Sequence, residues 1–91
     1  MEEKSLFDCE VGDIFTINRI EENDSTKNYL YSLGFLKNVD VLVLQKYGDS
    51  VVIKIFESRL GIESNISSNI YGHIKENNKS NPHSKSKRKD Q

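Results

Sequence analysis

Apolar residues occur in short runs before residue 77, and their spacing predicts a mainly β domain with a small amount of helix. Over residues 14–20, Phe15 and Ile17 alternate with polar neighbours, as a half-buried strand requires. Ile20 falls out of this phase, and a β-bulge near residues 18–19 would restore its direction. The first long strand is therefore expected over residues 14–20.

A short helix is predicted after this strand. Asp24 and Ser25 are residues of the type that caps a helix N-terminus, and Gly34 is placed to end the helix in a left-handed conformation. Phe35 would then pack back on Leu30, as the Schellman motif favours. We expect a helix of about two to three turns, which needs tertiary packing to persist.

A β-hairpin is predicted next. Valines occupy one face of residues 39–47 and leucines the other, so this strand is expected to be central and covered on both sides. Gly48 and Asp49 form a hairpin signal, with glycine first as a type II′ turn prefers. The β-branched run over residues 51–55 should pair antiparallel with the preceding strand.

Three brief elements complete the pattern. Leu60 and Ile62 indicate another short extended piece, and residues 63–69 can form one or two helical turns. Residues 70–74 have the pattern of a closing strand, in which Gly72 indicates a bulge or a close backbone approach. Strands this short with connections this tight favour closure into a small five-stranded barrel, because closure removes exposed edges.

The predicted elements share one core. The fold class is therefore mainly β, a small β-barrel with one inserted α-helix between its first two long strands and a second short helix. The core is expected to contain Leu30, Leu33, Val41, Val43, Ile53 and Ile55.

Length and charge divide the chain into a folded body, residues 1–76, and a tail, residues 77–91. A chain of 91 residues forms one domain and has no room for a deep catalytic cleft. The body is acidic, with 8 basic and 13 acidic residues, whereas the tail has 5 basic residues and only Asp90 as an acid. The tail contains no apolar residue except the ring of Pro82, so we expect it to be disordered and basic.

Candidate chemistry is sparse. The glycines do not form a phosphate-binding loop of the P-loop type, so any nucleotide hydrolysis would belong to a partner. Candidate metal ligands are Asp8, Cys9, Glu10, His73 and His83, but they have no Cys-x-x-Cys or His-x-x-x-His spacing. Cys9 with His73 is the one nucleophile and base pair, and no acid is placed to orient it.

The same residues have simpler structural explanations. A lone cysteine is most often a small buried apolar residue, and His73 should face solvent because it alternates with Ile74. We therefore predict no catalytic, cofactor-binding or metal-binding residues, no cofactor and no enzymatic activity.

The order of apolar residues and glycines resembles the FeoA (ferrous iron transport protein A) family across about residues 5–75. The most specific stretch is LYSLGFLKNVDVLVL, a helix ending in Leu-Gly-Phe followed by a turn and an aliphatic strand. Departures include Tyr29, where many members have Arg, Lys37 and Asn38 in place of Pro-Gly, and Ser67 in place of a frequent Ala. The matching positions are Leu6, Gly12, Ile17, Ile20, Leu30, Leu33, Gly34, Phe35, Val41, Val43, Leu44, Leu60, Gly61, Ile62, Ile66 and Ile70.

The resemblance implies an SH3-like barrel in a small cytoplasmic accessory protein. Members of this family are associated with the GTP-binding ferrous iron permease of prokaryotes, so the implied partner is the cytoplasmic part of that permease. The implied role is to bind this partner and to modulate its activity or assembly. The alternative is an SH3-like regulatory or adaptor module, related to the C-terminal domain of iron-dependent repressors, that binds another protein or nucleic acid.

The remaining features agree with a cytoplasmic protein that acts by binding. The longest aliphatic run is far shorter than the ~20 residues that cross a bilayer, so no direct membrane insertion is expected. A single cysteine and the absence of a signal-peptide pattern favour a reducing compartment. Basic tail residues could touch nucleic acid or anionic lipid, but no aromatic residues are interleaved with them, so we expect no nucleic-acid partner. The sequence does not fix the oligomeric state, and a monomer is favoured.

Overall fold

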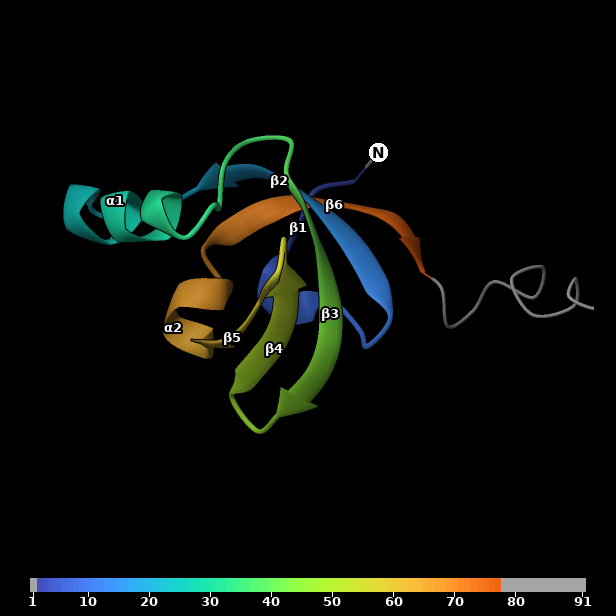
Figure 1. Ribbon diagram of the computed structural model, residues 1–91. Coiled ribbons are helices and arrows are strands. Elements are labelled where there is room, and N and C mark those ends of the chain that lie inside the picture. The colour runs from blue at the N-terminus through green and yellow to red at the C-terminus, as the bar shows by residue number, and fades with distance from the viewer. Residues whose placement is uncertain (1, 78–91) are drawn as a thin grey trace, which may run out of the picture.

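The computed structural model describes residues 2–77 as one antiparallel sheet that curls around a core, with two short α-helices beside it (Figure 1). The strands are paired in the order β1-β6-β2-β3-β4-β5. Their bounds are β1 Lys4–Ser5, β2 Asp13–Ile20, β3 Asp40–Tyr47, β4 Ser50–Ile55, β5 Ser58–Glu63 and β6 Ile70–Asn77. The helices are the 3₁₀ turn η1 Leu6–Asp8 and the α-helices α1 Asp24–Ser32 and α2 Ser64–Ser67.

This architecture confirms the SH3-like fold with one inserted helix and a second short helix. One strand was not predicted, because β1 has two residues and so carries no periodicity. The expected closure is incomplete: within the described residues, β1 pairs with β6 and β5 pairs with β4, and the two end strands do not pair with each other. The sheet therefore keeps an open side.

The predicted bulge in β2 is confirmed. The register between β2 and β6 shifts between Ile17 and Arg19, so that the extra residue Asn18 lets Ile20 turn back toward the core. Ile17 and Ile20 are consequently both buried. The bulge therefore brings Ile17 and Ile20 into the same core.

The N-cap residue of α1 differs from the predicted one. Asn23, rather than Asp24 or Ser25, is the N-cap residue, and its side-chain oxygen accepts a hydrogen bond of 2.8 Å from the backbone N–H of Thr26. Asp24 instead lies in the first turn, where a negative charge favours the helix dipole. The sequence gives three adjacent residues of capping type, and the extended backbone of Asn23 decides among them.

The C-terminus of α1 is a Schellman motif, as predicted. The backbone N–H of Phe35 donates to the carbonyl of Leu30 at 3.0 Å, and the N–H of Gly34 donates to Tyr31 at 3.0 Å. Gly34 has φ +102°, which only glycine adopts without strain. The motif turns the chain so that Phe35 and Leu30 are both fully buried.

Two other turns also follow the sequence. Asn38 has φ +74° in the connection from α1 to β3, as its tolerance of the left-handed region allows. Gly48 has φ +50° at the first central position of the β3–β4 turn, where Tyr47 pairs with Ser50. This two-residue turn sets the register as far as the Gln45–Val52 pair, and the register then shifts between Gln45 and Val43.

Gly72 allows β2 and β6 to approach each other closely. A side chain at Gly72 would place its Cβ 2.0 Å from the carbonyl oxygen of Thr16 and 2.9 Å from the ring of Phe15. The predicted close approach is therefore correct, and only glycine fits this position without a shift of the backbone.

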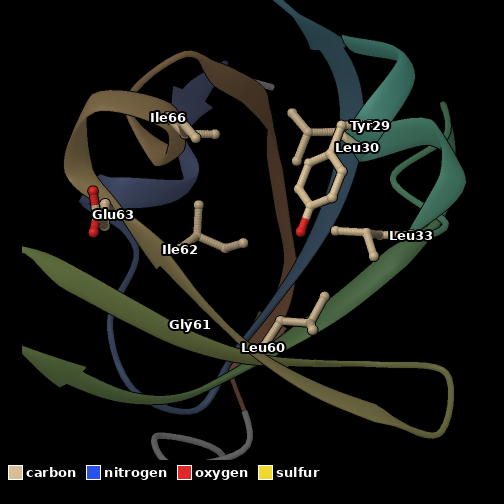
Figure 2. A pocket seen from close by; sticks show the side chains of 8 residues that line it. All are labelled: Tyr29, Leu30, Leu33, Leu60, Gly61, Ile62, Glu63 and Ile66. Atoms are coloured by element: carbon tan, nitrogen blue, oxygen red, sulfur yellow. The ribbon is translucent and has the colours of Figure 1, made fainter. Parts of the chain in front are cut away.

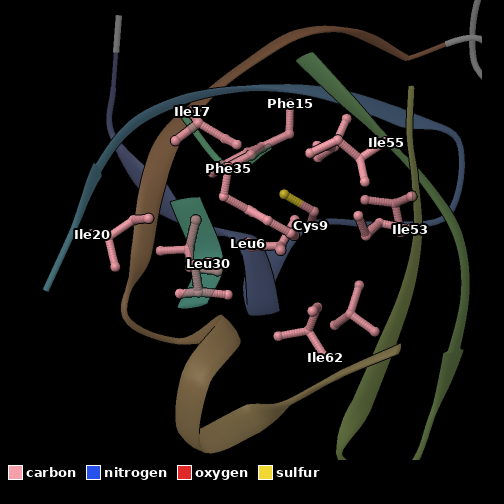
Figure 3. Packing of buried hydrophobic residues seen from close by; sticks show 14 residues of the cluster. Leu6, Cys9, Phe15, Ile17, Ile20, Leu30, Phe35, Ile53, Ile55 and Ile62 are labelled. Atoms are coloured by element: carbon pink, nitrogen blue, oxygen red, sulfur yellow. The ribbon is translucent and has the colours of Figure 1, made fainter. Parts of the chain in front are cut away.

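The core lies inside the curl of the sheet and receives residues from η1, α1 and the strands β2 to β6 (Figure 3). Five of the six predicted core residues are buried, whereas Leu33 is half-buried at the edge of the core. The far face of β3 is less covered than expected, since Leu42 and Leu44 are only half-buried. The buried apolar residues are Leu6, Cys9, Phe15, Ile17, Ile20, Leu30, Phe35, Val41, Val43, Val51, Ile53, Ile55, Ile62 and Ile70.

The last strand runs longer than predicted. β6 ends at Asn77 rather than at Ile74, and the Asn77 side chain donates a hydrogen bond to the buried carboxylate of Asp13. Asn77 therefore belongs to the body and not to the tail. The prediction of a disordered basic tail otherwise concerns residues 78–91, which lie outside the described residues.

Candidate functional site

An apolar groove of about 240 Å³ separates helix α1 from the edge strand β5 (Figure 2). Leucine and isoleucine side chains from α1, β5 and α2 point into it from facing sides. The groove is defined by Tyr29, Leu30, Leu33, Leu60, Gly61, Ile62, Glu63 and Ile66, and is called the α1–β5 groove below.

Two local features build the groove walls. The periodicity of α1 places Tyr29 next to Leu30, so that Leu30 is buried while Tyr29 keeps 61% of its surface exposed at the rim. On the other wall, Ile62 is buried while Leu60 and Ile66 are half-buried at the edge of the core. The groove is thus continuous with the core at its floor and open to solvent at its rim.

One charged group borders this apolar surface. Glu63 is exposed at the end of β5, where its backbone also caps α2. The volume lies below the ~300 Å³ at which pockets for drug-sized ligands begin. The groove therefore suits a few side chains of another protein better than an organic cofactor.

Cys9 lies in the core, as the sequence analysis predicted for a lone cysteine. It is fully buried, and its Sγ donates a weak hydrogen bond to the carbonyl of Ser5 at 3.6 Å. Burial, with a smaller contribution from the charge of Asp13, raises the pKa of the Cys9 thiol to about 12. The thiol is therefore protonated at neutral pH, which disfavours both nucleophilic attack and metal ligation.

The structure separates the other candidate ligands. Asp8 and Glu10 are exposed on either side of the buried Cys9, and their backbone N–H groups are held by Ser5 and Asp13. Within residues 2–77 no group of three or more His, Cys, Asp or Glu side chains is placed to hold a metal ion. His83 lies outside the described residues.

His73 is half-buried, and not exposed as predicted. The physical reason is that β6 is an interior strand with β1 on one side and β2 on the other, so its outer face is shielded by neighbours. Hydrogen bonds from Asn18 and Arg19 lower the pKa of Glu3, and the nearby charge of His73 adds a smaller effect in the same direction. The structure does not bring His73 together with Cys9 in any hydrogen bond among the described residues.

Ion pairs cover the outer face of β2 and β6. Arg19 pairs with Glu3 at 2.9 Å and with Glu21, and its guanidinium lies 4.4 Å above the ring of Tyr71. Each of these charges has a partner of opposite sign, which is the arrangement of a stabilised surface rather than of a reactive centre.

A second polar cluster on the same face is centred on Asp40. Its carboxylate accepts hydrogen bonds from Thr16 Oγ1 at 2.7 Å and from Lys75 Nζ at 2.9 Å. These two bonds, the one from Thr16 first, hold the pKa of Asp40 below its ordinary value of 3.8. The cluster joins β2, β3 and β6 at the outer surface.

The groove was not predicted from the sequence. Its residues come from two separate stretches of chain, residues 29–33 at the end of α1 and residues 60–66 in β5 and α2, so no local motif connects them. One signal was present: Tyr29 places a large aromatic side chain next to the apolar stripe of α1, where it has nothing to bury it locally.

No helix within the described residues is both long and apolar enough to cross a membrane.

Comparisons with known proteins agree with the fold. A family model described as the FeoA domain matches residues 4–73. The crystal structure of an iron uptake regulatory protein (FeoA) is 18% identical with a TM-score of 0.73, over 81% of this chain and 99% of that chain. The solution structure of a FeoA protein from Chlorobium tepidum is 21% identical with a TM-score of 0.74, over 87% of this chain and 77% of that chain.

A transcriptional repressor also contains this fold. A manganese-dependent transcriptional repressor is 20% identical with a TM-score of 0.70, over 79% of this chain but only 41% of that chain. The likeness therefore concerns one part of the repressor. A comparison of the sequence with curated proteins finds no match.

Proposed function

The chain belongs to the FeoA domain family, and from this membership we propose that it is an accessory protein of ferrous iron transport that binds the cytoplasmic part of a GTP-dependent iron permease and modulates its activity. In this role the protein is cytoplasmic and acts by binding rather than by catalysis. The observation that carries the proposal is the family match over residues 4–73, which spans nearly the whole described body.

The α1–β5 groove is the surface that best fits such a role. Its floor is apolar and its rim carries the exposed ring of Tyr29, a residue type that is enriched at the centre of interfaces. A domain of this size offers a patch near or below the ~800 Å² per partner of a standard interface. The association should therefore be weak and reversible, as regulation of a transporter requires.

The experiment compares binding of the wild-type chain and two tyrosine variants to the purified cytoplasmic portion of the permease from the same organism. Isothermal titration with the nucleotide state varied should give saturable binding of the wild type. Tyr29→Ala should weaken it about tenfold, as for an aromatic interface residue. Tyr47→Ala is the matched control, because Tyr47 is 62% exposed at the β3–β4 turn and does not line the groove.

Cells provide the second measurement. A deletion strain should take up less ferrous iron under iron limitation, and the wild-type gene should restore uptake better than the Tyr29→Ala gene. Absence of both binding and an uptake defect would overturn the transport role.

The repressor likeness supports one alternative, an SH3-like regulatory or adaptor module that serves another protein or nucleic acid. The two roles predict different neighbours, since a transport accessory should be encoded beside its permease. A gene position beside a regulator, together with a mobility shift on the adjacent promoter DNA, would favour the alternative.

A further inference from the structure

Strand β5 forms an open edge of the sheet, and this edge borders the α1–β5 groove. Within the described residues β5 pairs with β4 alone, over the register from Ile55–Ser58 to Ser50–Glu63. Leu60, Gly61 and Ile62 at the centre of β5 line the groove (Figure 2). An edge strand beside an apolar groove offers unpaired backbone groups for hydrogen bonds and a groove for the side chains of another segment.

The register identifies which backbone groups of β5 are unpaired. In an antiparallel ladder, residues alternate between pairs that exchange hydrogen bonds and pairs whose N–H and C=O groups point away. The two-residue turn makes Ile55–Ser58 a hydrogen-bonded pair, so the next such pair is Ile53–Leu60. The backbone groups of Arg59 and Gly61 therefore point toward the open edge.

The β3–β4 hairpin leads independently to the same assignment of backbone groups in β5. In the β3–β4 hairpin the closing pair is Tyr47–Ser50, which directs the backbone groups of Ser50 and Val52 toward β3. Val51 and Ile53 are then the residues that bond to β5, and they lie opposite Ile62 and Leu60. No backbone bond from another element of the described chain reaches Arg59 or Gly61.

From this juxtaposition we propose that the β5 edge takes up an extended segment of the partner protein as an added strand, whose alternate apolar side chains fill the α1–β5 groove. The segment would bond to the free N–H and C=O of Gly61 and place side chains beside Leu60 and Ile62. A residue opposite Glu63 would be basic, because this carboxylate is the one acidic group lining the groove. The inference rests on the proposed function, and it specifies how that partner is held.

Two other occupants fit the groove less well. Residues 78–91 of the chain itself contain no apolar side chain except the ring of Pro82, so they cannot supply the alternating apolar side chains that would fill an apolar groove. A second copy could pair its own β5 edge, but its Ile62 is already buried in its own core and its Leu60 is packed against that core. A separate segment with free apolar side chains can both bond to the backbone of β5 and fill the groove.

Substitutions at Gly61 test the added strand directly. Gly61→Pro removes the N–H that points outward, and proline is tolerated at an edge strand where this N–H faces solvent. Gly61→Ala is the matched control, because a Cβ at this position meets nothing within 4 Å and the N–H is kept. Thermal unfolding of both variants should match the wild type, which shows that β5 itself is intact.

Two probes are used with these variants: the cytoplasmic portion of the permease, and a display library of random ten-residue peptides. Gly61→Pro should weaken binding of both about tenfold or more, through loss of a hydrogen bond in a desolvated site, while Gly61→Ala binds within about twofold. Selected peptides should have apolar residues at positions i and i+2 and a basic residue at one end. Amide hydrogen exchange of Gly61 should slow on binding.

The outcomes separate the added strand from the transport role. If the permease portion binds wild type and Gly61→Pro equally, the added strand is wrong and the transport role stands. If library peptides of the expected pattern bind through Gly61 but the permease portion does not bind, the transport role is wrong and the groove serves another protein. If neither probe binds, the added strand and the transport role are both wrong. If ultracentrifugation shows a dimer that Gly61→Pro abolishes, the β5 edge pairs with a second copy instead.

Discussion

The two sides of this small sheet are built in opposite ways. On the β2–β6 side the strands approach so closely that Gly72 has no room for a methyl group, and the outer face is covered by paired charges around Arg19 and Asp40. On the α1–β5 side the sheet ends at β5, which pairs with β4 alone among the described residues, and the apolar groove separates this edge strand from the helix. One side is closed by its own residues, and the other leaves both backbone and apolar groups available.

If the α1–β5 groove binds a partner as proposed, this difference separates residues that act on stability from residues that act on binding. Closed pairing and close packing on the β2–β6 side fix the register of the long strands, so substitutions there should act on folding. The α1–β5 side contributes less to the pairing of the sheet. Substitutions at the rim of the α1–β5 groove should therefore act on association with a partner. Four predictions test this division, from the largest expected change in the free energy of unfolding to the smallest.

Gly72→Ala should lower the free energy of unfolding by about 3 kcal/mol or more, because its Cβ would meet the Thr16 carbonyl oxygen and the strands would have to separate. Gly61→Ala, the same change on the open side, should be within about 0.5 kcal/mol of wild type or slightly stabilising, since it also restricts the unfolded chain. Urea denaturation of both variants gives the comparison. Equal effects at the two glycines would contradict the division.

Ser67→Ala should raise the free energy of unfolding by about 1 kcal/mol, because the fully buried Ser67 hydroxyl has no hydrogen-bond partner among the described residues. Alanine also favours the helical conformation of α2. Ser68→Ala is the matched control, since the Ser68 hydroxyl donates to the carbonyl of Ser64 at 2.6 Å and its removal should bring no gain. A destabilised Ser67→Ala protein would show that this hydroxyl has a partner in solution.

Asp40→Asn should lower the free energy of unfolding by roughly 0.5 kcal/mol at pH 7, a small value because the Asp40 and Lys75 side chains are 35% and 60% exposed. The pKa of Asp40 is lower in the folded than in the unfolded chain, so its contribution is present above pH 3.8 and is lost as pH falls through the folded pKa. The difference between wild type and variant should therefore vanish in acid. Thermal unfolding measured at several pH values checks this, and a gap that widens in acid would contradict the pairing.

Tyr29→Ala should change the free energy of unfolding by less than about 0.5 kcal/mol, because most of the Tyr29 side chain is exposed and alanine favours the helix. Its binding to the permease portion should nevertheless weaken, as described above. A variant that loses stability and binding together would place Tyr29 in the fold rather than in an interface. Circular dichroism melts beside the titrations make this distinction.

Local patterns predicted much of the fold. The alternation in residues 14–20 with its phase slip at Ile20 predicted the β2 bulge, and Gly34 before Phe35 predicted the Schellman end of α1. These features are set within a few residues of chain, where periodicity and left-handed backbone preferences act directly. The N-cap of α1 was assigned wrongly because adjacent residues of capping type differ little in energy, and the structure places the cap at Asn23. Strand β1 was missed because it is too short to show a period.

Residue patterns alone were enough to predict the family, the order of the longer elements and the burial of Cys9, because each depends on short-range pattern or residue type. Only the tertiary structure decided that the sheet stops short of closure and that α1 faces the edge of β5 across a groove. The physical reason is that Tyr29, Leu60 and Ile66 are brought together by packing of separate elements around one core, and their proximity depends on every register between them. A groove of this kind has no local sequence period, since it consists of what the core leaves uncovered.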